Sequence, residues 1–132
     1  MSWLNHVANP TGLENIYTEG TPSLSGVSLH EVRLVRDGPS LILRFDLNRP
    51  PQNPPKKWIT KGFNTVQLEI TLGGIHEVRL DGFTTTIRAD ISLTKPDLVT
   101  LKANSAGARI SATADAAFLS KISAYCNEDE TH

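Results

Sequence analysis

Residues 28–47 read SLHEVRLVRDGPSLILRFDL, which is two alternating apolar runs joined by a short turn sequence. The first run covers residues 29–35 and the second covers residues 40–47, with Arg-Asp-Gly-Pro at 36–39 between them. An Asp-Gly pair between alternating runs is a strong signal for a β-hairpin. We therefore predict two antiparallel strands here, with one apolar face and one polar face.

The loop length also predicts which residues of this hairpin face each other. Paired strands must place their apolar side chains on one face. A four-residue loop then sets Glu31 opposite Arg44 on the polar face, where a pair of opposite charges acts mainly on the register. The same count gives the pairs Val35–Ser40, Leu34–Leu41 and Val32–Leu43.

The sequence HEVRL of residues 30–34 recurs at residues 76–80. A repeat of this kind can mark a duplicated hairpin. Convergence also accounts for it, since both copies open a predicted hairpin, and both explanations stay open. A four-residue loop at 81–84 would set Glu77 opposite Arg88, whereas a three-residue loop at 72–74 would set Glu69 opposite Glu77.

Further alternating runs extend the strand pattern along the chain. Turn residues separate them, as Gly73-Gly74, Asp81-Gly82 and Lys95-Pro96-Asp97 do. With the hairpin at 29–47, these runs predict an antiparallel sheet of about seven strands. The further runs are residues 65–71, 75–80, 85–93, 98–103 and 108–113.

Two helices are predicted at the ends of the chain. Asn9 can cap a short N-terminal helix that begins at Pro10, with Leu13, Ile16 and Tyr17 on one face. At the other end Thr113 can cap a helix, and its apolar stripe consists of Phe118, Leu119, Ile122 and Tyr125.

The predicted fold is therefore α+β and mainly β, an antiparallel sheet with a short N-terminal helix and a C-terminal helix packed on its apolar face. The length of 132 residues fits a single domain, residues 1–132. Four prolines mark a long loop at 48–64, and residues 127–132 form an acidic tail that we expect to fray. The predicted core contains Leu34, Leu41, Leu43, Phe45, Leu68, Ile70, Val78, Ile87, Ile91, Leu101, Ile110, Phe118 and Ile122.

Composition argues against several classes of protein. The net charge of −1 lacks the basic excess of proteins that bind nucleic acid or membrane surfaces. The single cysteine, Cys126, cannot form an internal disulfide, and the N-terminus has no signal peptide pattern. No apolar run reaches the length of a membrane span. We expect a cytoplasmic protein that binds neither nucleic acid nor membrane.

The residues do not form a recognisable catalytic or metal-binding motif. His30 and His76 each precede a Glu on a strand, so the two side chains project to opposite faces and cannot chelate one ion together. Cys126 has no CxxC partner, which favours an inert thiol. We expect no enzyme activity, no cofactor and no metal.

The mixed charges of the polar sheet face and the Pro-rich loop are the candidate binding site. Trp58 beside two lysines could stack on a nucleic acid, but an anchor that folds back onto the protein is favoured. We expect partner contacts to involve Glu31, Arg33, Arg44, Asp46, Lys56, Lys57, Trp58, Arg79 and Arg88.

Residues 22–93 resemble the immunity protein 50 family of bacterial polymorphic toxin systems. The resemblance rests on HEVRLVRDGPSL at 30–41, on the W-x-x-x-G-F-N segment at 58–64, and on IHEVRLDGF at 75–83. It implies a cytosolic protein that binds and neutralises a cognate toxin without catalysis. The alternatives are a structural or oligomerising β-module that lacks a toxin partner, for which self-association would be the sign, and an enzyme of unrecognised type.

Overall fold

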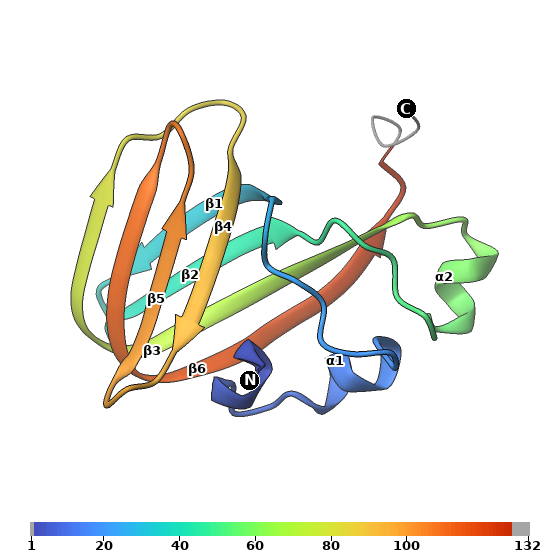
Figure 1. Ribbon diagram of the computed structural model, residues 1–132, viewed down its shortest axis with the longest axis horizontal. Helices are drawn as coiled ribbons and strands as arrows, with labels where there is room; N and C mark the ends of the chain where they lie inside the picture. The colour runs from blue at the N-terminus through green and yellow to red at the C-terminus, as the bar shows by residue number, and fades with distance from the viewer. Residues whose placement is uncertain (1, 128–132) are drawn as a thin grey trace.

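The computed structural model describes residues 2–127, and within them six antiparallel strands close into a barrel in the order β1-β2-β3-β6-β5-β4 (Figure 1). Three short helices lie outside the barrel wall. In chain order the elements are η1 (Trp3–His6), α1 (Thr11–Ile16), β1 (Val27–Val35), β2 (Ser40–Asp46), α2 (Lys56–Thr60), β3 (Thr65–Asp81), β4 (Arg88–Thr94), β5 (Val99–Asn104) and β6 (Arg109–Tyr125).

The prediction of seven strands is wrong because Gly73-Gly74 is not a turn. Both glycines lie inside β3, a single strand of 17 residues. β3 pairs with β2 up to Gly73 and continues alone along β6 to Asp81. Gly74 has φ +71°, and a side chain there would run into Asp115 of β6. The glycines therefore let two long strands bend and stay paired, where a turn would have separated them.

The predicted C-terminal helix is also wrong, since residues 109–125 form β6. This strand pairs with β3 from Thr65–Tyr125 to Asp81–Arg109. Its small interior residues, such as Ala112 and Ala114, are fully buried against the core. Pairing with β3 satisfies the backbone of the whole segment, and this long-range pairing outweighs the helix propensity of an alanine-rich sequence.

Both HEVRL copies contain a β-bulge at the histidine. In β1 the register against β2 shifts between Leu29 and Glu31, so His30 is the extra residue. In β3 the register against β6 shifts between Ile75 and Glu77, so His76 is the extra residue. A bulge changes the phase of the alternation, which lets apolar residues three positions apart face the interior together.

The hairpin register is confirmed, whereas the registers predicted for the second HEVRL copy are wrong. Glu31 pairs with Arg44, and the three apolar and loop-end pairs predicted for the hairpin are also present. Glu77 lies opposite Thr113 of β6, not opposite Arg88. Glu69 lies opposite Arg44, not opposite Glu77. These two errors follow from reading one long strand as two.

The N-terminal helix is present, but Asn9 does not cap it. The N-cap is Pro10 without a side-chain bond, while the Asn9 amide side chain bonds the backbone oxygen and nitrogen of Leu119 at 2.8 Å each. Leu13, Ile16 and Tyr17, which the helical spacing places on one face, are all buried. Residues 48–64 contain the unpredicted α2, and residues 128–132 of the expected tail lie outside the described part.

Most of the predicted core is buried inside the barrel. Leu34 and Phe118 are exceptions, with 54% and 40% of their surface exposed. Val78 and Ile122 are partly buried and pack against the core. Leu34 and Val78 lie where the barrel wall is incomplete, and Phe118 points outward because its segment is a strand.

Candidate partner-binding site

A row of alternating charges crosses the outer face of four strands. The register sets Glu31 of β1 beside Arg44 of β2, Arg44 beside Glu69 of β3, and Glu69 beside Lys121 of β6. Arg44 Nε donates to Glu31 Oε1 at 3.0 Å. Cross-strand neighbours of opposite charge stabilise the pairing of adjacent strands. We call these four residues the charge row.

Arg33 lies next to the charge row and is more exposed than Glu31 and Glu69. Its guanidinium nitrogens lie 3.9 Å from Glu31 Oε2 and 3.9 Å from Glu69 Oε1, and half of its side chain is exposed. Both distances are long for an ion pair, so this cation is held loosely and is available to a partner.

The arginines lower the pKa of the Glu31 carboxyl below its ordinary value. The main cause is the hydrogen bond from Arg44, and the nearby charges of Arg33 and Arg44 add to it. Partial desolvation acts in the opposite direction and is outweighed. Glu31 therefore stays ionised at neutral pH.

Asp46, at the end of β2, is the buried charged residue of this face. Its carboxylate lies 2.7 Å from His30 Nε2 and accepts hydrogen bonds from Gln67 Nε2 at 2.9 Å and from the Tyr125 hydroxyl. Gln67 in turn accepts from Arg44 Nη1 at 3.4 Å. Asp46 is thus a structural anchor that ties β1, β3 and β6 to its own strand, β2, and only 5% of its surface is exposed.

The second HEVRL copy repeats the local contacts in an exposed setting. His76 Nε2 lies 2.8 Å from Asp115 Oδ1, and Arg79 lies 3.7 Å from Glu77. All four side chains are more than half exposed. The two copies therefore share a His–Asp contact and a Glu–Arg contact, but only the first copy joins a buried network.

The structure does not bring all the predicted site residues together. Glu31, Arg33, Arg44 and Asp46 form one continuous group on β1 and β2. Arg79 and Arg88 lie outside this group. Arg88 is on β4, where it is the register partner of Ser28 of β1. The predicted residues of the Pro-rich loop are on α2, which projects from the barrel beyond the ends of β3 and β6 (Figure 1).

Trp58 is a partly buried anchor of the Pro-rich loop. It packs against the hydrophobic core and, with Pro50 and Phe63, lines a small groove of about 80 Å³. Lys56 and Lys57 are exposed on the same helix. This arrangement agrees with the anchor interpretation of Trp58 and leaves the two lysines as the accessible charges.

Sequence reasoning missed several residues of the group. The partner predicted for Glu69 is Glu77, which lies on the same strand, and Lys121 falls in the segment predicted to be a helix. Polar and apolar residues alternate from Lys121 to Ala124 in the sequence, but a bulge at Ser120 interrupts the pattern on the N-terminal side. His30, Gln67 and Tyr125 were not predicted as partners of Asp46.

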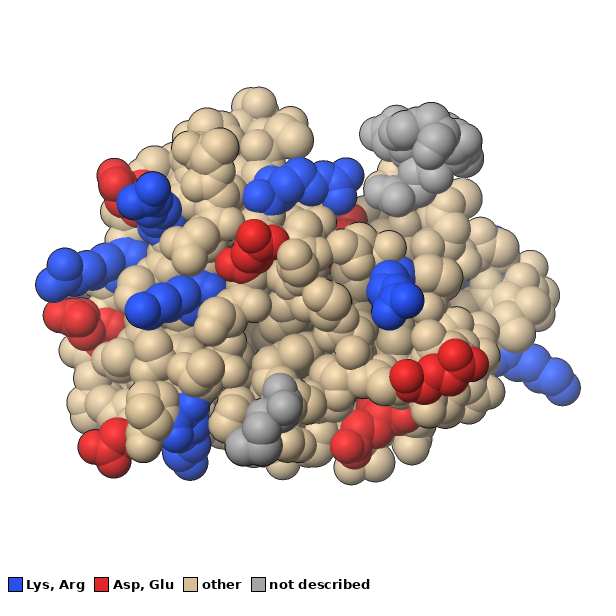
Figure 2. All heavy atoms as spheres, in the orientation of Figure 1, with Lys and Arg blue, Asp and Glu red and all other residues tan. Residues whose placement is uncertain are grey.

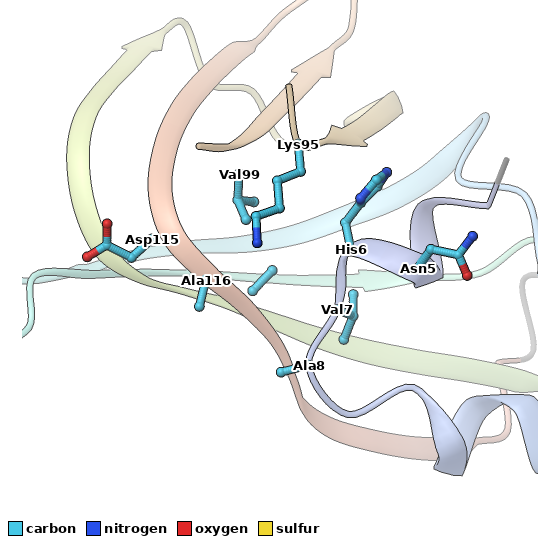
Figure 3. A pocket seen from close by; sticks show the side chains of 9 residues that line it. Asn5, His6, Val7, Ala8, Lys95, Val99, Asp115 and Ala116 are labelled. Atoms are coloured by element: carbon cyan, nitrogen blue, oxygen red, sulfur yellow. The ribbon is translucent and has the colours of Figure 1, made fainter. Parts of the chain in front are cut away.

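A separate hollow of about 210 Å³ lies between η1, the β4–β5 turn and β6 (Figure 3). The Lys95 side chain extends into it, and His6 lies at its side. Asp115, on its rim, is in contact with His76. The hollow presents one amine beside small apolar residues, and its lining residues include no paired acid and base.

The surface charges are mixed. On the face shown in Figure 2, Lys and Arg alternate with Asp and Glu, and no area of one sign dominates. Among residues 2–127, no three His, Cys, Asp or Glu side chains are grouped to hold a metal ion. None of the described helices is long and apolar enough to span a membrane.

Comparison with known proteins places most of this chain in one family. Residues 9–125 match the family described as Immunity protein 50. The matched range contains all six strands and both α-helices. No curated protein and no solved structure matches the chain.

Proposed function

Because the chain belongs to the immunity protein 50 family, we propose that it binds a cognate bacterial toxin and blocks it without catalysis. The toxin would belong to a polymorphic toxin system, and the complex would form in the cytoplasm of the producing cell. The family match over residues 9–125 is the observation that carries this proposal.

The outer face of β1 and β2 is the proposed centre of toxin binding. It combines the loosely held Arg33 with the ordered charge row, and Asp46 fixes the strands beneath it. Preorganised charges of both signs select a partner with the complementary pattern and speed its association. Lys56 and Lys57 on α2 would add contacts at a second point, whereas Arg79 and Arg88 lie outside this centre.

Co-expression with the product of the adjacent toxin gene tests the function. We expect the chain to be recovered with the toxin in a pull-down and to protect cells that express the toxin. If the purified pair does not associate and cells are not protected, the immunity function is excluded for that toxin.

Charge reversal tests the binding face. Arg33→Glu should weaken toxin binding by about tenfold or more, as expected for a central interface residue. Lys102→Glu is the matched control, because Lys102 is an exposed cation of β5 outside the charge row. Equal affinities for both variants and the wild type would show that the toxin binds at another surface of the chain.

The alternative is an oligomerising β-module without a toxin partner. It would form a stable self-assembled species at micromolar concentration, which sedimentation velocity of the purified chain would detect. A monomer that binds the toxin excludes this alternative.

A further inference from the structure

The barrel has an incomplete seam between β1 and β4. Only Val27–Ala89 and Ser28–Arg88 pair across it, and one further bond joins Leu29 N to Ile87 O at 2.9 Å. Beyond this point the β1 backbone pairs with β2 alone among the described residues. Residues 31–35, after the bulge, therefore present a regular free edge of about 17 Å at ~3.3 Å per residue.

A second free edge borders the same opening. The part of β3 from His76 to Asp81 pairs with β6 on one side and, within residues 2–127, has no strand on the other. Ile75 N donates to Pro39 O at 3.1 Å, which ties β3 to the β1–β2 turn. The opening is thus framed by β1, by this turn and by the second half of β3.

Apolar side chains that belong to the barrel interior are exposed in this opening. Leu34 and Leu80 have 54% and 50% of their surface exposed. Leu34 lines a groove of about 520 Å³ together with Ile75 and Val78. The register partners of Leu34 and Leu80 are Leu41 and Ile110, and both partners are buried in the barrel wall. The interior therefore continues into a groove that the described residues do not fill.

The charges beside the groove indicate what would fit there. The charge row ends with Glu31 at the free edge of β1. A strand that lay along this edge would therefore be favoured if it placed a basic side chain beside Glu31. By the same reasoning, the strand would be favoured if it placed an acidic side chain beside Arg33. Arg36 also lines the groove and makes no ion pair within the described part of the chain.

We propose that an extended segment of the toxin adds to the free edge of β1 at residues 31–35 as an antiparallel strand. Read from its N-terminus, the segment would present an apolar residue at Leu34, an acidic one at Arg33, an apolar one at Val32 and a basic one at Glu31. Its main chain would bond the β1 edge, and its apolar side chains would fill the groove. This inference rests on the proposed toxin binding and names the mode of recognition.

A single extended segment fits this site better than a second copy of the chain. The free edge is bounded by β4 at one end and by the second half of β3 at the other. A second copy that used its own β1 edge would bring its own β3 and β4 into the same narrow opening. An extended segment has no such bulk.

Hydrogen exchange of the full chain, with and without the adjacent gene's toxin, tests the inference. We expect the toxin to slow exchange of backbone amides within residues 31–35 at least about tenfold, because added strand bonds protect them. If the toxin binds and these amides exchange unchanged, the strand addition is wrong while the immunity function stands. If the toxin does not bind, the immunity function itself fails, and the inference fails with it. Protection that depends on the concentration of the free chain would instead assign the edge to a second copy.

Two matched variants test the groove. Leu34→Lys should weaken toxin binding about tenfold, because it places a charge where an apolar side chain would be buried. Phe83→Lys removes an apolar residue of similar exposure, 52%, from the loop between β3 and β4, which does not line this groove, and should leave the affinity unchanged. Circular dichroism of both variants shows whether each remains folded. Folded variants with equal affinity would overturn the proposed occupancy.

Discussion

Arg44 Nε donates to Glu31 Oε1 at 3.0 Å, and Arg44 is at the same time the register neighbour of Glu69. Arg44 of β2 is therefore the register neighbour of two acids, one on each of the strands that flank β2. Without it, both acids would face each other across β2, and the outer sheet face would lose its alternation of charge.

Removal of this guanidinium should raise the pKa of Glu31. In Arg44→Met the carboxyl loses its main stabilising hydrogen bond, so its pKa should return toward the ordinary value of about 4.3. Carboxyl-carbon NMR across an acid titration measures this change. An unchanged titration would show that Arg33 alone accounts for the lowered pKa.

The same pair should make stability depend on pH in the acid range. The folded pKa of Glu31 is lowered, so its contribution is fully present above the ordinary pKa and is lost as the pH falls through the folded pKa. Urea unfolding from pH 7 to pH 2 should show a steeper loss for the wild type than for Arg44→Met. Parallel curves would contradict this assignment.

The two His–Asp contacts should differ in their effect on stability. Asp46→Ala removes a buried carboxylate that accepts hydrogen bonds from Gln67 and Tyr125, and should lower the free energy of unfolding by about 1–3 kcal/mol. Asp115→Ala removes the equivalent partner of His76 at an exposed site and should change it by less than about 0.5 kcal/mol. Chemical denaturation measures both, and equal losses would show that burial does not distinguish the two contacts.

The two adjacent glycines of β3 should respond differently to alanine. Gly74→Ala must adopt φ +71° and displace Asp115, so we expect a loss of about 1–2 kcal/mol or more. At Gly73 a methyl group would lie 3.5 Å from the Phe118 ring, an ordinary contact, so Gly73→Ala should be neutral or stabilising by up to about 1 kcal/mol. Thermal unfolding of both variants measures the difference. A similar loss at both positions would mean that the strand does not bend at Gly74.

Tyr17 should make the protein less stable in alkaline solution. Its ring is buried, its hydroxyl donates to Arg49 O at 2.6 Å, and burial raises its pKa above the ordinary value of about 10. Above pH 10 the unfolded chain releases this proton before the folded chain does, so stability falls as the pH rises. Tyr17→Phe should lose this dependence at a cost of about 1 kcal/mol at neutral pH. Unfolding curves from pH 8 to pH 11 provide the measurement.

Part of the proposed binding face could be predicted from the sequence because its information is local. The Arg-Asp-Gly-Pro loop and the two alternating runs determine the register of one hairpin, and that register places Glu31 opposite Arg44. The position of Arg33 on the polar face follows from the same count. Glu69 and Lys121 could not be added, because their strands meet β2 and each other only through pairing across long stretches of chain.

The sequence by itself determined the β-hairpin, its register, the short N-terminal helix and most of the interior residues, since each depends on neighbours within about twenty positions. Only the tertiary structure decided that residues 65–81 are one strand and that residues 109–125 are another. An alanine-rich segment such as Ala112–Ala117 favours a helix when isolated. In the barrel those alanines fit the limited space beside β3, and the backbone bonds along the full length of β3 are available only once both strands are in place.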